Sequence, residues 1–254
     1  MEVRLLNTGI HVWQEYWGPL LNDGDSKGNS VVYGFENISP SHKQNTQAAI
    51  ADNGTCFGYV AGGTIRVQDD RVDWLVYQDQ WFSVPKGCDL TLMANTRVLV
   101  SQRIGYRGLY ALGGPIERCG RLRYIDGCSD TLLCAPPLLG DPCLNLLHFP
   151  PRINQTVHTH PSTRAGIVAR GQGMCVTPSE KTPLFPGVLF YIARETEHSF
   201  LTEDNEMDVI AYHPDSDWGP THEDHPMVNR TWVSGHKIDN NKQQHRSVSI
   251  IRGL

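Results

Sequence analysis

The segment RINQTVHTHPSTRAGIVARG, residues 152–171, contains two histidines, His158 and His160, two positions apart. The residues around them are rich in Thr, Val and Ile, which favour β-strands. Because side chains alternate between the faces of a strand, residues i and i+2 project from one face about 7 Å apart. Two imidazoles in this arrangement are suited to bind one metal ion.

A third histidine, His198, lies near the end of the next β-prone segment, PGVLFYIARETEHSF, residues 186–200. Imidazoles from adjacent strands can bind one ion together and leave other coordination positions open, as a catalytic metal requires. We therefore predict a metal site formed by His158, His160 and His198.

The residues around the histidines follow two series of intervals: His158-x-His160-x3-Arg164-x6-Gly171, and Gly187-x5-Ala193-x-Glu195-x2-His198. These are the intervals of the two cupin motifs, so residues 152–200 resemble a cupin, a small antiparallel β-barrel that holds a mononuclear metal in its mouth. The three histidines match the metal-binding positions of the motifs. Arg164 stands where the motif usually has Glu, and Ala193 and Glu195 stand where Pro and Gly are usual.

The first half of the chain resembles a second cupin that lacks the histidines. GYVAGG at 58–63 is similar to GIVARG at 166–171, an offset of 108 positions (166 − 58). The same offset takes the Pro-x-Gly turn at 85–87 to residues 193–195. It pairs the remaining motif positions as follows: Ile50 with His158, Asp52 with His160, Cys56 with Arg164, and Leu90 with His198. Because Ile and Leu cannot bind a metal, we predict that the first barrel is metal-free.

The predicted fold is all-β, with two tandem cupin barrels of the double-stranded β-helix or jelly-roll type and few short helices, one of them around residues 41–50. Short β-prone runs separated by Gly, Asp and Lys-Gly turns indicate such barrels. We predict an N-terminal cupin-like barrel without metal ligands over residues 1–112 and a connecting segment over 113–142. The metal-binding barrel covers 143–254 and ends in a polar loop and tail.

The composition argues against several classes of partner. Only 19% of the 254 residues are charged, the net charge is −5, and the basic residues are scattered, so neither nucleic acid nor an anionic membrane is expected as a partner. No apolar run approaches the roughly 20 residues of a membrane span, and the N-terminus lacks a signal-peptide pattern. Seven cysteines without a CxxC pair fit reduced thiols, so we expect a cytoplasmic protein.

Arg164 is the departure from the motif with the clearest chemical consequence. A guanidinium stays protonated and has no lone pair for a cation, so it cannot replace a glutamate ligand. Beside a metal it is suited to bind a carboxylate of the substrate through two hydrogen bonds. The alternative is that Arg164 pairs with Glu195 or Glu197 and only shapes the barrel.

Two further residues are candidates for catalysis by proton transfer, His213 and Tyr191, both on the last predicted strands. His148 on the first strand of the second barrel has a similar status, and a hydrogen-bonded core or rim role is the alternative for each. The loop after His213 contains several potential ligands and fits either a flap over the mouth or a solvated acidic loop: Asp215, Asp217, His222, Glu223, Asp224 and His225.

The cupin resemblance implies a mononuclear metal enzyme, and three imidazoles with open positions resemble the Fe(II) sites of cupin dioxygenases. Mn, Ni, Cu or Zn would also suit imidazole ligands. The expected partners are O₂ and a small anionic substrate that carries a carboxylate or chelates the metal, and the resemblance also implies a homodimer. Two alternatives stay open: an O₂-independent metal-dependent lyase, isomerase or hydrolase, and a non-catalytic cupin that binds a small ligand.

Overall fold

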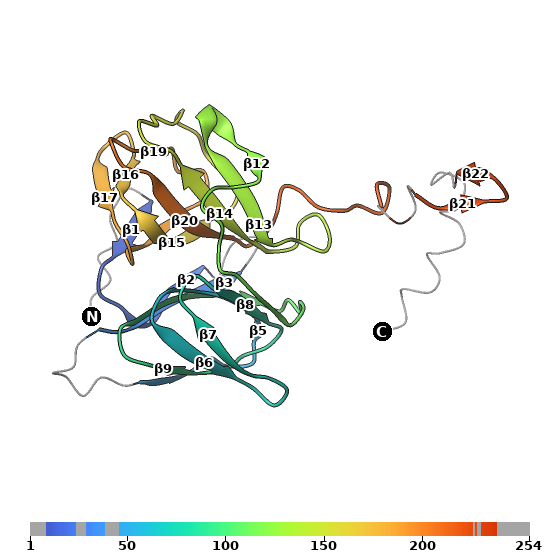
Figure 1. The fold of residues 1–254 in the computed structure, drawn as a ribbon, viewed down its shortest axis with the longest axis horizontal. Helices are drawn as coiled ribbons and strands as arrows, with labels where there is room; N and C mark the ends of the chain where they lie inside the picture. Colours follow the sequence, from blue (N-terminus) through green and yellow to red (C-terminus); the bar gives the residue numbers. More distant parts are fainter. Residues whose placement is uncertain (1–8, 24–28, 39–45, 226, 228–229, 238–254) are drawn as a thin grey trace. The chain divides into compact units, whose positions relative to one another are not determined.

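The computed structural model describes residues 9–23, 29–38, 46–225, 227 and 230–237, and the regular secondary structure of these residues is almost entirely β-strand. A short exception is the 3₁₀ turn η1 (Ile125–Gly127). The chain divides into two compact units, one formed by residues 1–135 and 142–215 and the other by 136–141 and 216–254. The first unit contains two β-barrels (Figure 1). The predicted all-β fold with two tandem barrels is therefore confirmed.

The N-terminal barrel packs a six-stranded sheet against a four-stranded sheet. Alternating apolar residues of both sheets fill its core, among them Val60, Val98 and Leu92, which are at most 2% exposed. The larger sheet has the order β11 (Ala111–Gly113), β8 (Trp81–Val84), β5 (Gly54–Gly62), β10 (Thr96–Ile104), β3 (Ser30–Asn37), β2 (Trp17–Asp23). The smaller has the order β4 (Gln47–Ala49), β9 (Asp89–Leu92), β6 (Thr64–Gln68), β7 (Asp73–Tyr77).

The C-terminal barrel is built in the same way from a seven-stranded and a three-stranded sheet. Its core includes Phe149, Val209 and Met207, none of them exposed. The larger sheet has the order β1 (Ile10–Trp13), β18 (Leu189–Ile192), β15 (Arg164–Gly171), β20 (Met207–His213), β14 (Cys143–Phe149), β13 (Ser129–Cys134), β12 (Leu122–Arg123). The smaller has the order β17 (Lys181–Leu184), β16 (Gly173–Val176), β19 (Ser199–Leu201).

The first strand of the chain belongs to the barrel of the other half. β1 precedes the N-terminal barrel but pairs with β18 of the second barrel, with Trp13 opposite Leu189. The equivalent edge of the N-terminal barrel is covered by β11, which follows that barrel's last long strand and pairs with β8, with Gly113 opposite Trp81. The sequence did not indicate the crossing of β1, and the domain boundaries at residues 112 and 142 stay predictions.

The two larger sheets share a third apolar cluster. It combines buried residues of the first barrel, such as Tyr59 and Leu99, with buried residues of the second, such as Ile210 and Tyr212. Along β20 the side chains alternate, so Val209 and Ala211 lie in the core of the second barrel while Ile210 and Tyr212 lie in this shared cluster. One face of the second barrel's large sheet therefore packs in the cluster shared with the first barrel, and the other face lines the interior of the second barrel.

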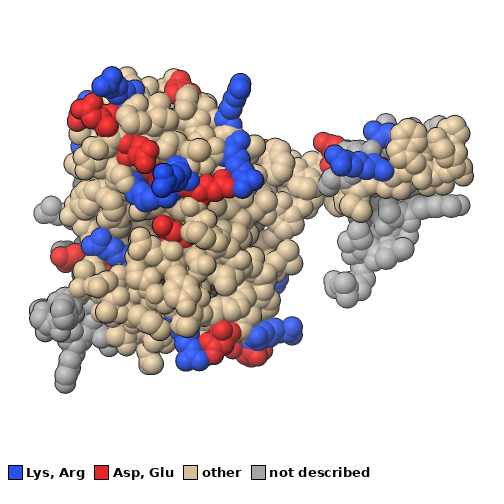
Figure 2. All heavy atoms as spheres, in the orientation of Figure 1, with Lys and Arg blue, Asp and Glu red and all other residues tan. Residues whose placement is uncertain are grey.

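On the surface, basic and acidic side chains are interspersed over the face seen in Figure 2. Pairs such as Arg66 and Asp73, 2.5 Å apart, account for part of this pattern. Within the described residues, no helix has the length and apolar composition of a membrane span.

The second unit contains a short hairpin, β21 (Trp232–Val233) paired with β22 (His236–Lys237). Its turn uses Ser234 and Gly235, both at positive φ. The helix predicted around residues 41–50 is not found in the part that is described, where β4 forms a strand, and residues 41–45 lie outside the described residues. The tail from residue 238 onward also lies outside them.

Candidate metal centre

The backbone pairs two of the three predicted ligands directly. The N–H of His158 donates to the carbonyl oxygen of His198 (2.9 Å), and the N–H of His198 donates to the carbonyl oxygen of His158 (3.0 Å). This isolated antiparallel bridge puts their ring centroids 4.6 Å apart. The His160 ring lies 5.0 Å from that of His158 and 5.2 Å from that of His198. One ring nitrogen of each histidine lies within 4.8 Å of the others, so the three histidines form one cluster.

Hydrogen bonds fix which nitrogen of two of these rings is available. Nδ1 of His158 lies 2.8 Å from the carbonyl oxygen of Thr156, and Nδ1 of His198 lies 2.8 Å from that of Thr196. A carbonyl oxygen only accepts, so each Nδ1 carries the proton and each Nε2 keeps a lone pair. Backbone carbonyls in this position are the usual support of metal-binding histidines.

The environment also keeps two of the three rings, those of His160 and His198, neutral. Burial, followed by the nearby Arg164 guanidinium, lowers the pKa of His160 to about 3. Burial is also the main cause that lowers the pKa of His198 to about 4. Neutral imidazole is the form that binds divalent metals. The donor set therefore fits a first-row divalent ion such as iron, manganese, nickel, copper or zinc, to be held by His158, His160 and His198.

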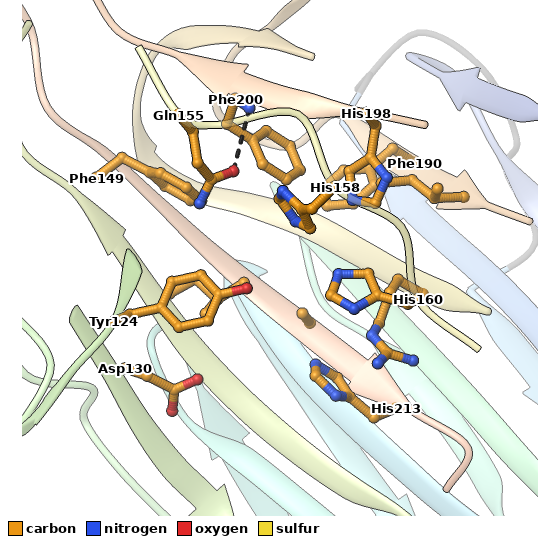
Figure 3. Close-up of a pocket in the computed structure, with 14 residues that line it drawn as sticks. Tyr124, Asp130, Phe149, Gln155, His158, His160, Phe190, His198, Phe200 and His213 are labelled. Atoms are coloured by element: carbon orange, nitrogen blue, oxygen red, sulfur yellow. Dashed lines mark hydrogen bonds between the residues drawn. The ribbon is translucent and has the colours of Figure 1, made fainter. Parts of the chain in front are cut away.

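A pocket of about 450 Å³, including its open mouth, extends from the histidines into the second barrel (Figure 3). Its wall is mostly apolar and carries a few polar side chains, as ligand sites commonly do. The lining residues are Tyr124, Asp130, Leu147, Phe149, Gln155, His158, His160, Arg164, Phe190, Ile192, His198, Phe200, Ala211 and His213.

Arg164 is the first residue of β15 and lines this pocket, although it is only 5% exposed. One guanidinium nitrogen donates to the carbonyl oxygens of Ser162 (3.2 Å) and Thr163 (2.9 Å) and to the hydroxyl of Ser162 (2.6 Å). The preceding loop thus fixes a positive charge beside His160. A cation here cannot be a ligand, but it favours an anion in the pocket.

Glu195 occupies the turn position where the cupin motif usually has Gly. Its φ of 57° is left-handed, the conformation that glycine adopts without strain. Its N–H donates to the carbonyl oxygen of His160 (2.8 Å), and its carboxylate accepts from the hydroxyl of Thr159 (3.4 Å). The turn before His198 therefore keeps its shape and holds the backbone of His160.

His213, the last residue of β20, also lines the pocket, and its Nε2 has no hydrogen-bond partner within the described residues. Burial, with Arg164 and His160 as further causes, lowers the pKa of His213 well below its usual value. An imidazole held neutral in this way is a weak base, and its Nε2 is placed to accept a hydrogen bond from a bound molecule.

Tyr191 requires a correction. On β18 the side chains of Phe190 and Ile192 line the pocket, so Tyr191 between them projects from the opposite face. It is buried in the apolar cluster shared by the two barrels, beside the ring of His11. A residue on that face cannot reach a molecule bound at the histidines, and Tyr191 is not proposed further as catalytic.

His148 lies away from the pocket for the same reason. Its Nδ1 is 2.7 Å from Oδ1 of Asp208, whose other oxygen accepts from Nε of Arg170 (2.8 Å). The neighbouring Leu147 and Phe149 project into the pocket instead. His148 therefore belongs to a buried polar network of the sheet.

The sequence did not point to three of the polar residues that line the pocket: Tyr124, Asp130 and Gln155. Gln155 lies within the segment that contains the first two histidines. The other two lie in the stretch predicted to connect the barrels, where Asp130 belongs to β13 and pairs with Leu147 of β14. An acidic residue inside an otherwise β-prone run, SDTLLC, was the available signal.

Of the comparisons with known proteins, the sequence comparisons found nothing: no family model matches the chain, and no curated protein matches it. Solved structures do match. A cupin 2 conserved barrel domain protein from Leptotrichia buccalis has a TM-score of 0.54 at 12% identity, with 80% of this chain and 88% of that one covered. A putative glyoxylate induced protein from Pseudomonas aeruginosa has a TM-score of 0.54 at 10% identity, with 84% and 91% covered. A salicylate 1,2-dioxygenase from Pseudaminobacter salicylatoxidans has a TM-score of 0.52 at 10% identity, with 76% and 74% covered.

At these identities the similarity identifies the fold. Strand order, the paired barrels and the similar structures agree with one another. The protein therefore has the fold of the cupin proteins to which it is similar, with two barrels and a three-histidine cluster in the mouth of its C-terminal barrel.

Proposed function

We propose that this protein is a mononuclear metal-dependent dioxygenase that uses Fe(II) and acts on a small carboxylate-bearing or chelating substrate. The observation that carries the proposal is the convergence of three imidazoles on one pocket. Three protein ligands leave coordination positions for substrate and O₂, whereas a closed structural site uses four protein ligands. Bound Fe(II) would supply a centre where substrate and O₂ react within one coordination sphere.

In this proposal the surrounding residues position the substrate and exclude water. The Arg164 guanidinium, fixed by Ser162 and Thr163, binds an anionic group of the substrate. The apolar wall, including Phe149 and Phe200, excludes water from the reacting groups. Nε2 of His213 accepts a hydrogen bond from the substrate as it binds and so helps to orient it.

The similarity to a salicylate 1,2-dioxygenase supports the choice of reaction class, because that protein by its name combines a carboxylate-bearing substrate with O₂. The proposed partners are accordingly a small anionic molecule, O₂ and, as a homodimer, a second copy of the chain. The proposed compartment is the cytoplasm.

The first test is the metal content of protein purified without an affinity tag or chelator, beside His198→Ala. About one iron per chain in the wild type and almost none in the variant is expected, since loss of one of three ligands removes most of the affinity. O₂ uptake with a panel of aromatic and aliphatic carboxylic acids then tests the reaction. Absence of metal in both proteins, even after reconstitution, contradicts the proposal.

Other outcomes identify the alternatives. Turnover that continues without O₂, with zinc or another metal bound, would indicate a lyase, isomerase or hydrolase in which the metal polarises the substrate. Binding of a carboxylic acid without any turnover would indicate a ligand-binding cupin.

A further inference from the structure

Besides Nε2 of His213, two further polar atoms of the pocket wall have no hydrogen-bond partner in the described residues, and neither belongs to the proposed metal site. They are Oδ1 of Asp130 and Nε2 of Gln155, both shielded from solvent. A buried polar group without a hydrogen-bond partner destabilises the folded state. Two such atoms on the wall of one pocket indicate that a bound molecule completes their hydrogen bonds.

The orientation of the Gln155 amide follows from its neighbours. The N–H of Phe200 donates to Oε1 of Gln155 (3.2 Å), and the N–H of Gln155 donates to the carbonyl oxygen of Phe200 (3.0 Å). A backbone N–H needs an acceptor, so the oxygen of the amide must face Phe200, and Nε2 is left for the pocket (Figure 3). Gln155 is only 3% exposed, so the pocket contains a fixed donor at this point.

Asp130 presents the opposite chemistry. Its Oδ2 accepts from Nδ2 of Asn145 (2.9 Å), which holds the carboxylate in place, and Oδ1 remains as an acceptor. In Figure 3, Asp130 and Tyr124 lie across the pocket from His158 and His198. The acceptor is therefore at the end of the pocket remote from the metal ligands.

Apolar side chains supply part of the pocket wall and favour a flat or hydrocarbon section of the ligand: Leu147, Phe149, Phe190, Ile192 and Phe200. A bound molecule must therefore combine an apolar body with polar groups in set places. An apolar ligand would leave Asp130 and Gln155 unpaired and would be rejected.

We propose that Asp130 and Gln155 determine the substrate class: a small acid with an apolar body that carries an amino or hydroxyl donor at the end remote from the histidines. Asp130 Oδ1 accepts from that donor, and Gln155 Nε2 donates to an oxygen of the substrate. The inference rests on the proposed function only for the placement of the acid group at the metal end.

The test compares probes that differ in the donor alone: 4-aminobenzoate with 4-methylbenzoate, and the corresponding 3-isomers. Amino and methyl groups have similar size, but only the amino group donates. Because burial raises the pKa of Asp130, calorimetry is done at about pH 8, well above the usual pKa of a carboxyl group. It should give at least roughly tenfold tighter binding of the amino probe in one isomer pair. Each protein is measured with metal bound and again after chelator treatment.

Two variants separate the two roles. Asp130→Leu should remove the preference for the amino probe, while Gln155→Leu should weaken both probes by a similar factor and keep the preference. Asp130→Asn serves as a second variant in case Asp130→Leu does not fold, and it should reduce the preference several-fold because the charge is lost. Thermal unfolding checks that each variant is folded.

The outcomes distinguish this inference from the proposed function. Protein that binds no metal but keeps an Asp130-dependent amino preference would refute the metal enzyme and support the inference. Metal-loaded protein that binds amino and methyl probes equally in both isomers, or binds none of them at up to roughly 10 mM, would overturn the inference and leave the metal site standing.

Discussion

The two barrels of this chain have the same frame but differ in their mouths. In the N-terminal barrel the N–H of Ile50 donates to the carbonyl oxygen of Cys88 (2.9 Å), as the N–H of His158 donates to that of His198 in the other barrel. Cys88 and Ile50 thus stand where two imidazoles stand. The backbone geometry is the same at both places. In the N-terminal barrel the two residues are buried, whereas in the C-terminal barrel they line a pocket that carries polar side chains.

This pairing corrects the predicted counterpart of His198. The offset of 108 gives Leu90, but strand pairing gives Cys88, an offset of 110 (198 − 88). The connection from β18 to β19 has two more residues than the one from β8 to β9, which shifts the offset along the chain. Leu90 is a core residue of the first barrel with 1% exposure.

The two mouths also differ in whether their polar side chains have hydrogen-bond partners within the protein. Gln102 occupies the position in the first barrel that His213 occupies in the second. The preceding residues show this: Ser101 pairs with Phe57, and Tyr212 pairs with Ala165, the counterpart of Phe57. Nε2 of Gln102 donates to the carbonyl oxygens of Ala51 (2.7 Å) and Gly54 (3.2 Å). The first mouth satisfies its own polar groups, whereas the second keeps donors and acceptors for a ligand. Of the two similar barrels, the one whose mouth contains polar atoms without hydrogen-bond partners is therefore the one suited to bind a ligand.

The largest effect is expected for His198→Ala against its counterpart Cys88→Ala. The first variant should lose bound metal and fall to background turnover, since only two imidazoles remain. The second should keep about one metal per chain and near-normal turnover, because its mouth binds no metal. Elemental analysis and O₂ uptake measure both, and equal metal loss in the two variants would contradict the assignment of the site to one barrel.

A second comparison concerns the paired charges behind the mouths. Register places Asp208 opposite His148 in one barrel and Arg97 opposite Glu36 in the other. Asp208 has no exposure and contacts His148 and Arg170 at 2.7 and 2.8 Å, whereas Arg97 and Glu36 are 3.8 Å apart.

Asp208→Asn should therefore lower the free energy of unfolding by about 3 kcal/mol, as expected when one partner of a buried pair is removed. Glu36→Gln should change it by less than about 1 kcal/mol, as for a partly exposed pair. Urea unfolding of both variants measures the difference. Equal losses would show that the two pairs contribute alike, against this interpretation.

Metal binding itself should stabilise only a protein with an intact second mouth. An ion that binds the folded state alone adds about 2.7 kcal/mol at a hundred times its Kd. Wild type and Cys88→Ala should gain this stability when Fe(II) is added without O₂, and His198→Ala should not. Thermal unfolding with and without chelator measures the gain; a gain that persists in His198→Ala would indicate another metal site.

The sequence was sufficient to predict both barrels and the histidine cluster, because motif intervals encode strand spacing and strand spacing fixes which side chains meet. It could not place Tyr191, since a one-residue change of register exchanges pocket and core faces. The pairing of β1 with the second barrel was also hidden, because its partner β18 lies about 180 residues further along the chain. Asp130 and Gln155 were missed because their importance lies in unpaired atoms, which no interval reveals.

The smallest expected effect tests the turn that precedes His198. Glu195 has a φ of 57°, and a left-handed non-glycine residue costs roughly 1–2 kcal/mol. Glu195→Gly removes that strain but adds about 0.5–1 kcal/mol of backbone entropy to the unfolded chain, and the lost contact with Thr159 is long and exposed. A net gain of about 0.5 kcal/mol is therefore expected, with metal content unchanged because the N–H that binds the His160 carbonyl is retained.

In the first barrel, Gly87→Ala should instead destabilise, because a Cβ there would lie 2.1 Å from the carbonyl oxygen of Ile50. If Glu195→Gly lost metal, the side chain itself would be supporting the site, and the difference between the two mouths would extend to the turns that frame them.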